Sequence, residues 1–118
     1  MAVTGIGGVF FRAKDPDGLT AWYRLHLGVT MENWEPWRQQ AGPTVFMPFK
    51  GDTDYWAADR QWMTNFRVEG LEAMIERLKA AGVAVETRAE WNTPETGQFA
   101  RIHDPEGNPI ELWQEPKE

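Results

Sequence analysis

The chain repeats itself once. Phe11-Arg12 is followed by a helical pattern that ends at Gly28-Val29, and Phe66-Arg67 is followed by a second helical pattern that ends at Gly82-Val83. The two copies lie about 55 residues apart, a spacing that is too long, with too few copies, for a solenoid. Half of a 118-residue chain is too short to bury its own sheet. The two halves are therefore expected to form a single domain over residues 1–118.

Each half is predicted to contain one helix. In the first half, Asp15 is placed to cap a helix that has Pro16 in its first turn, and the helical spacing ends at Gly28. In the second half, apolar residues recur at the spacing of one helix face, namely at Leu71, Met74, Ile75, Leu78 and Ala81.

Short runs rich in β-branched and aromatic residues, bounded by Gly, Pro, Asp and Asn, predict the strands. In the first half these runs are residues 6–14, 29–34, 38–41 and 44–49. In the second half they are 61–68, 83–88, 99–103 and 109–114, with a tight turn at 104–108. The pattern predicts an α+β fold of two βαβββ modules, at about residues 4–49 and 61–115, joined by a polar connector at 50–60.

Composition narrows the classes of function. Twelve Lys and Arg against eighteen Asp and Glu give a formal net charge of −6. Because a nucleic-acid-binding surface needs an excess of positive charge to neutralise phosphates, no nucleic-acid partner is expected. The absence of cysteine excludes disulfides, thiolate zinc sites and cysteine nucleophiles. The first residues lack a basic leader, and no apolar run approaches the ~20 residues that span a bilayer. These features predict a cytoplasmic protein with no membrane partner.

Strand alternation separates a helix-facing surface from an exposed one. The uniformly apolar positions, Ala100, Ile102, Ile110 and Leu112, are predicted to pack beneath the helices. The opposite, concave surface then combines aromatic side chains with charged ones, namely Arg12, Arg67, Arg101, His103 and Glu111.

The two ends of the repeat resemble a known superfamily. The opening Gly8-Val9-Phe10-Phe11-Arg12-Ala13-Lys14-Asp15-Pro16 and the close His103-Asp104-Pro105-Glu106-Gly107-Asn108-Pro109-Ile110-Glu111-Leu112, on a doubled βαβββ plan, are similar to the vicinal oxygen chelate superfamily. That superfamily includes glyoxalase I, bleomycin-resistance proteins, fosfomycin-resistance enzymes and extradiol dioxygenases. The resemblance implies a curved, cup-like mixed sheet with helices on its outer face. It also implies a homodimer, because a second subunit often completes or borders the cup.

Metal-using members of the superfamily place two His or Gln and two Glu inside the cup. Here Gly8 and Met63 stand at the His positions, and the run 44–49 contains no carboxylate. Glu111 alone retains the ligand type, whereas a stable divalent site needs three or four protein groups. The sequence therefore predicts no cofactor, with a divalent metal disfavoured.

Two residues are candidates for acid and base chemistry. Glu111 is interpreted either as a polar anchor or general base in the cup, or as a salt-bridge partner of Arg67, Arg101 or Arg12. His103 is interpreted either as an acid or base near neutral pH, or as a turn histidine bonded to Asp104 or to a backbone carbonyl.

The chain is rich in tryptophan, with seven in 118 residues. Tryptophans on the concave surface either line a cavity for a planar ligand or belong to a core or a dimer interface. In the connector, Tyr55 and Trp56 either form a lid over the cup or pin the loop. The predicted ligand-binding residues are Phe10, Arg12, Trp34, Trp62, Met63, Asn65, Arg67, Trp91, Arg101 and Trp113.

Together these features favour a protein of the glyoxalase and bleomycin-resistance type with a degenerate metal site. It is predicted to bind a small, partly apolar or aromatic molecule in a cup lined by Trp and Arg. The alternative is an enzyme of the lyase, isomerase or dioxygenase type that uses Glu111 as base or ligand, with or without a metal. A third hypothesis is a module that binds a protein partner through its Trp-rich surface.

Overall fold

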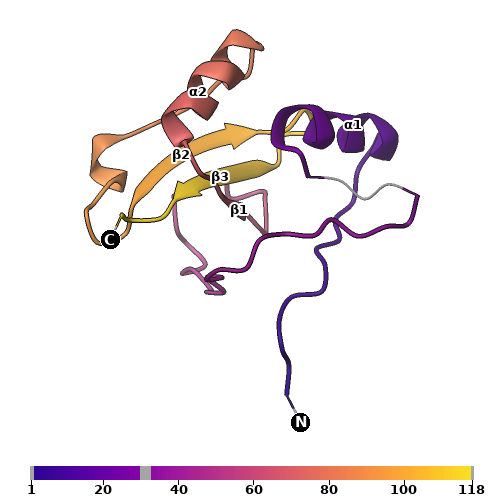
Figure 1. The fold of residues 1–118 in the computed structure, drawn as a ribbon, viewed down its shortest axis with the longest axis horizontal. Coiled ribbons are helices and arrows are strands. Elements are labelled where there is room, and N and C mark those ends of the chain that lie inside the picture. The colour runs from indigo at the N-terminus through magenta and orange to yellow at the C-terminus, as the bar shows by residue number, and fades with distance from the viewer. Residues whose placement is uncertain (1, 30–32, 118) are drawn as a thin grey trace.

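A computed structural model describes residues 2–29 and 33–117. The elements, in chain order, are helix α1 (Pro16–Leu27), strand β1 (Thr64–Arg67), helix α2 (Leu71–Ala80), the short 3-10 helix η1 (Ala89–Trp91), and strands β2 (Gln98–His103) and β3 (Pro109–Gln114). Figure 1 shows the three strands as one open sheet, with α2 on one side of it and the N-terminal segment extending away. The fold is α+β, as the sequence predicts.

The sheet is mixed, with the strand order β1-β3-β2. Strand β1 runs parallel to β3, and β2 runs antiparallel to it. The register places Phe66 beside Leu112, which lies beside Ala100. One position earlier along β3, Glu111 lies between Asn65 and Arg101. Because side chains alternate along a strand, these two rows point to opposite faces of the sheet.

The helix-facing row forms the core. Ala100, Ile102, Ile110 and Leu112 are completely buried, and they pack with Leu71 and Leu78 of α2. Burial of each large aliphatic side chain contributes about 1.5–3 kcal/mol. The helix-facing set predicted from strand alternation is confirmed.

The ends of α1 follow from local sequence. The Asp15 side chain accepts a hydrogen bond from the Gly18 backbone N–H at 3.1 Å, with Pro16 in the first turn. Gly28 ends the helix with a φ of 69°, in the left-handed region that glycine tolerates, and its N–H bonds the Arg24 carbonyl at 3.2 Å. The predicted helix and both of its boundary signals are present.

The turn at 104–108 ties α1 to the sheet. Asp104, 4% exposed, accepts hydrogen bonds from the backbone N–H groups of Glu106 (2.9 Å) and Asn108 (3.0 Å). It also accepts from the Tyr23 hydroxyl of α1 at 2.7 Å and the Asn108 side chain at 2.8 Å. The Glu106 carboxylate accepts from the Lys14 backbone N–H at 2.7 Å. The acidic and amide residues of this turn thus act as a structural clamp.

The second half contains the predicted first strand, the helix and the last two of the three strands that were predicted to follow it. Its predicted strand at 83–88 is reduced to an isolated bridge, in which the Glu86 N–H bonds the Arg101 carbonyl at 2.9 Å and the Arg101 N–H bonds the Glu86 carbonyl at 2.8 Å. The turn 104–108 and the last strand have the predicted bounds.

The first half departs from the prediction. Among the described residues, 2–14 and 36–50 form no strand, so the strands predicted at 6–14, 38–41 and 44–49 are absent, and the prediction at 29–34 falls partly outside the described residues. A strand needs a hydrogen-bonding neighbour, and these segments pair with no other strand in the part of the chain that is described. Phe10 (96% exposed) and Phe46 (78% exposed) point into solvent. The described sheet is therefore formed by strands within residues 64–114, all in the second half of the chain.

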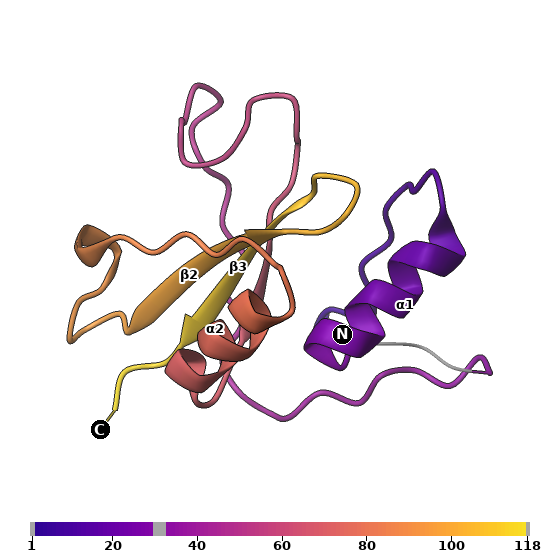
Figure 2. The same cartoon turned by 90° about the horizontal axis from the view of Figure 1, so that it is seen from above.

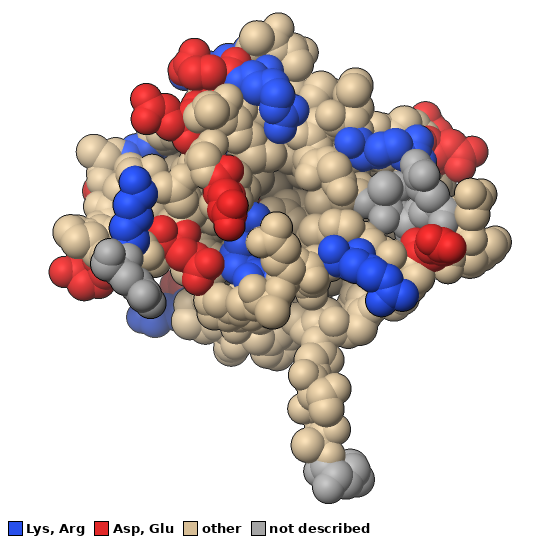
Figure 3. All heavy atoms as spheres, viewed as in Figure 1, with Lys and Arg blue, Asp and Glu red and all other residues tan. Residues whose placement is uncertain are grey.

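The remaining layers lie around this sheet. Seen from above, α2 crosses the strands while α1 stands to one side (Figure 2). The N-terminal segment projects from the body and carries no charge at residues 2–11 (Figure 3). No helix formed by the described residues is long and apolar enough to cross a membrane.

Candidate functional site

A row of polar residues crosses the face of the sheet opposite α2. Asn65, Glu111 and Arg101 come from β1, β3 and β2 and occupy adjacent register positions. Glu111 is 8% exposed and Arg101 is 5% exposed. Burying ionisable groups is costly unless they are hydrogen-bonded, so the partners of these two residues determine what the row can do.

Glu111 accepts hydrogen bonds from two uncharged side chains. The Tyr55 hydroxyl donates to Glu111 Oε2, and the Asn65 side-chain amide donates to Oε1 at 2.7 Å. Among the described residues, no ion pair joins Glu111 to Arg12, Arg67 or Arg101. Glu111 is therefore a polar anchor for two side chains in this structure.

Arg101 lies between two aromatic rings. Its Cζ atom is 4.7 Å from the ring centroid of Tyr55 and 5.5 Å from that of Trp91. Nη1 donates to the Tyr55 carbonyl at 2.9 Å. Nε and Nη2 are buried and have no hydrogen-bond partner among the described residues. An unsatisfied buried donor costs about 1–3 kcal/mol, so this guanidinium retains unused capacity for an acceptor.

The connector brings Tyr55 over this row. The Tyr55 ring stacks on Phe49, with centroids 5.7 Å apart and an interplanar angle of 10°. It also meets the edge of Trp91 at 5.8 Å. In Figure 1 the connector runs below the sheet while α2 lies above it, so Tyr55 approaches the face that α2 leaves open.

A second set of contacts anchors the connector. The Trp56 indole donates to the Arg60 carbonyl at 2.8 Å. The Arg60 guanidinium donates to Asn108 Oδ1 at 3.0 Å and to the Glu106 carbonyl at 2.9 Å. The sequence left two roles open for Tyr55 and Trp56, a lid or a pin for the loop. In the structure Tyr55 covers the polar row, and Trp56 helps to pin the loop.

The environment of Tyr55 changes its acidity. Burial, reinforced by the hydrogen bond to Glu111 and that carboxylate's charge, raises the pKa of Tyr55 to about 12, while nearby Arg101 acts in the opposite direction. The phenol is thus a neutral hydrogen-bond donor across the physiological pH range.

The predicted site residues fall into two groups. Asn65, Trp91, Arg101 and Glu111 are brought together, and Met63 is half-buried one residue before β1. Two others lie on the same open face with partners of their own: Arg67 donates to the Gln40 carbonyl at 2.8 Å, and Trp113 stacks on Phe99 at 6.3 Å. The exposed residues that the structure does not bring to the row are Phe10, Arg12, Trp34 and Trp62.

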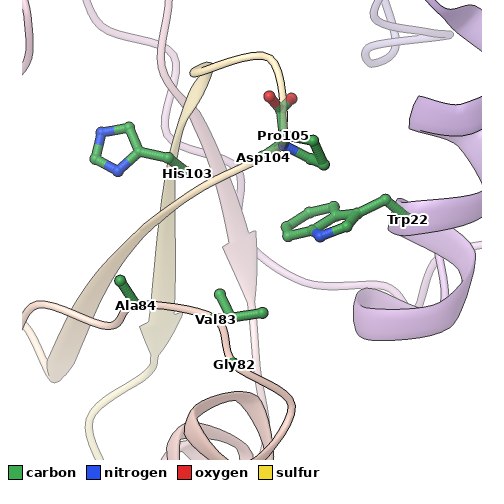
Figure 4. Close-up of a pocket in the computed structure, with 7 residues that line it drawn as sticks. All are labelled: Trp22, Gly82, Val83, Ala84, His103, Asp104 and Pro105. Atoms are coloured by element: carbon green, nitrogen blue, oxygen red, sulfur yellow. The ribbon is translucent and has the colours of Figure 1, made fainter.

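His103 borders a hollow that Trp22 of α1 also lines. This hollow of about 210 Å³ is lined by Trp22, residues 82–84 and residues 103–105, and in Figure 4 the His103 imidazole points away from Trp22. No hydrogen bond among the described residues joins His103 to Glu111 or to Asp104. The geometry gives no acid and base pair between His103 and Glu111.

Sequence reasoning missed two members of the site. Neither is among the predicted ligand-binding residues: the sequence predicts Tyr55 as a lid or as a pin for the loop, and Phe49 as part of a strand at 44–49. The available signal was compositional: the chain has two tyrosines, and Tyr55 is the one that lies in a polar connector, where an aromatic side chain needs a surface to cover. In residues 2–29 and 33–117, no group of three or more His, Asp or Glu side chains is placed to share a metal ion.

The fold has a solved counterpart. The crystal structure of TnmS3, an antibiotic binding protein from Streptomyces sp. CB03234, superposes with a TM-score of 0.64 and 23% sequence identity, covering 98% of each chain. At this identity the similarity shows a shared fold. No protein with a curated description matches the chain in sequence.

The sequence itself matches one family model. The model described as a glyoxalase-like domain covers residues 8–113, a span that includes both halves of the repeat and the turn at 104–108. The chain therefore belongs to the glyoxalase-like domain family of the vicinal oxygen chelate superfamily.

Proposed function

We propose that the protein binds a small, partly apolar or aromatic organic molecule on the concave face of its sheet. The observation that carries this proposal is Arg101, a buried cation between two aromatic rings that has two unpartnered donors beside the buried carboxylate of Glu111. Convergent polar groups between aromatic walls are typical of small-molecule sites. TnmS3, which shares the fold, is described as an antibiotic binding protein, and this supports the same broad class of ligand.

The proposal does not include a metal. The residues at the superfamily's ligand positions do not fit a divalent cation, because Gly8 and Met63 lack suitable donor atoms and Glu111 already accepts from Tyr55 and Asn65. The buried guanidinium of Arg101, opposite Glu111 in the sheet register, adds positive charge to this surface. This chemistry favours an anionic or electron-rich ligand.

We favour a binding role for Glu111 over a role as a catalytic base. Both carboxylate oxygens of Glu111 accept hydrogen bonds from this chain's own side chains, which hold the carboxylate in place as an acceptor. His103, the other candidate, makes no hydrogen bond to that carboxylate among the described residues. The arrangement suits recognition and sequestration of a molecule without bond breaking.

We further propose that the working unit is a homodimer. The extended segments of the first half expose Val9, Phe10, Phe46 and Met47, and β1 has only β3 as a neighbour in the described sheet. Exposed apolar side chains and unpaired strand edges favour association with a second copy. The uncharged N-terminal segment in Figure 3 reaches outward, where it can pair with a partner chain.

Binding is tested by calorimetric titration of the purified protein with a panel of aromatic compounds, including aromatic antibiotics. We expect saturable binding of at least one compound, and we expect Arg101→Met to weaken it by about tenfold or more, the effect of losing a charge-assisted contact. Arg77→Met is the matched control, because Arg77 belongs to α2, on the other side of the sheet, and donates to the His26 carbonyl at 3.0 Å. Lack of binding across the whole panel would count against the proposed function.

The dimer is tested by sedimentation at decreasing protein concentration. We expect a mass of two chains for the wild type, and a shift toward one chain for Phe10→Glu, because a charge in the exposed apolar segment opposes its burial. A wild-type protein that sediments as one chain at every concentration contradicts the dimer.

A further inference from the structure

The proposed binding site is already filled by a phenol from the protein's own connector. The Tyr55 hydroxyl donates to Glu111, its ring stacks on Phe49, and Arg101 Cζ lies 4.7 Å from its centroid. A free, flat hydroxylated aromatic molecule needs the same three features: an acceptor for its hydroxyl, an aromatic surface for its ring, and a cation near its π-system.

Tyr55 uses these features incompletely. Arg101 donates through Nη1 to the backbone carbonyl of Tyr55, while Nε and Nη2 have no partner among the described residues. A phenolic oxygen can donate one hydrogen bond and accept another. The Tyr55 oxygen lies close enough to the Arg101 side chain to be influenced by it, but it leaves Nε and Nη2 without a hydrogen-bond partner among the described residues. A molecule not tethered to the backbone can place its oxygen to donate to Glu111 and accept from Arg101 at once.

The connector allows this exchange without unfolding. Nε and Nη2 of Arg101 are shielded from solvent, so a ligand reaches them only when a covering group moves. Tyr55 is carried by a segment with no helix or strand, and its own N–H bonds Thr53 Oγ1 at 3.2 Å within the loop. Arg60 remains tied to the turn at 104–108, so only the tip of the connector needs to move.

We propose that Tyr55 is an internal substitute for the ligand, and that this site takes planar hydroxyarenes, which displace the Tyr55 ring from Glu111 and Arg101. The inference rests on the proposed function and specifies its ligand class. Because the internal ring competes with the ligand, the apparent affinity of the wild type is reduced by the fraction of molecules in which Tyr55 occupies the site.

The test compares two fluorescent probes of similar shape, 2-naphthol and 2-methoxynaphthalene, of which only the first donates a hydrogen bond. We expect the wild type to bind 2-naphthol about tenfold more tightly than 2-methoxynaphthalene. Tyr55→Ala should bind 2-naphthol about tenfold more tightly than the wild type does, because the competing ring is removed. Glu111→Gln should reduce the ratio of the two affinities, because the carboxylate that accepts the naphthol hydroxyl is gone. Tyr23→Phe, which alters the other tyrosine, is the matched control and should change neither affinity.

Each outcome bears on the inference. Equal affinities for the two probes, or weaker 2-naphthol binding by Tyr55→Ala, would overturn it. Should Tyr55→Ala fail to fold by circular dichroism, Tyr55→Phe replaces it: this variant keeps the ring and loses the bond to Glu111, so a smaller tightening is expected, and unchanged affinity overturns the inference. Panel compounds that bind without any preference for a hydroxyl refute the inference while the proposed function stands. Failure of the whole panel on the wild type is the separate failure of that function.

Discussion

Asp104 and Glu111 are both buried carboxylates, and each accepts a hydrogen bond from one of the chain's two tyrosines. Their other partners differ. Asp104 accepts from two backbone N–H groups of its own turn and from the Asn108 side chain. Within residues 2–29 and 33–117, Glu111 accepts from two side chains and from no backbone group, and the neighbouring Arg101 has two donors without a partner.

The difference separates structure from function. Backbone donors fixed by a tight turn cannot be exchanged without breaking the turn, so Asp104 is suited to hold α1 against the sheet. Side-chain donors on a connector can be exchanged for those of a ligand, so Glu111 is suited to binding. Functional sites commonly retain polar groups that stability alone does not favour.

The largest expected effect is on the structural carboxylate. Asp104→Ala should lower the free energy of unfolding by about 3 kcal/mol, because four buried or partly buried donors lose their acceptor at once. Urea unfolding at a fixed protein concentration measures this change. Glu111→Gln is the counterpart and should cost about 1 kcal/mol or less, since its amide oxygen still accepts from one donor. Equal losses in the two variants would remove the distinction.

The two tyrosines extend the comparison. Tyr23→Phe should lower the free energy of unfolding by about 1.5 kcal/mol, because its hydroxyl links α1 to the carboxylate of the turn. Tyr55→Phe removes a similar bond from the connector and should cost about 0.5 kcal/mol, because the loop stays anchored through Arg60. Chemical denaturation of the two variants under identical conditions gives the ranking, and a reversed order contradicts it.

The sequence predicted what local patterns determine. The caps of α1, the apolar spacing of α2 and the alternation in β2 and β3 each act within a few residues, and the structure reproduces them. The same alternation placed Arg101 and Glu111 together on the open face. The first-half strands were not formed, because pairing depends on a neighbour far away in the sequence or on another chain. Tyr55 was missed as a site residue for a related reason: its position depends on tertiary contacts of an irregular connector.

Substitution of Arg101 should change stability less than substitution of Asp104 does, and it distinguishes a binding role for this residue from a structural one. Arg101→Met keeps a long side chain and removes a buried charge with two unsatisfied donors, so the free energy of unfolding should stay within about 1 kcal/mol of wild type or rise slightly. Ligand binding should weaken by about tenfold or more in the same variant. Thermal unfolding and calorimetric titration performed side by side separate the two effects. A loss of stability above about 2 kcal/mol would make Arg101 a structural residue, like Asp104.

The smallest expected effect is seen in tyrosine ionisation, measured by tyrosinate absorbance in the Tyr23→Phe background, where Tyr55 is the one tyrosine left. Its pKa of about 12 in the folded protein lies above the ordinary value of 10.0, chiefly because of burial and then because of Glu111. A raised folded-state pKa means that the associated stability is complete below pH 10 and is lost as the pH rises through 12. Since the ring is partly exposed, solvent screening limits that contribution to less than about 1 kcal/mol.

Adding Glu111→Gln should lower the Tyr55 pKa toward 10, because the carboxylate's contribution disappears while Arg101 continues to favour the phenolate. A pKa that does not respond to Glu111→Gln would show that burial alone sets it, and that the bond from Tyr55 to Glu111 does not hold the connector in place.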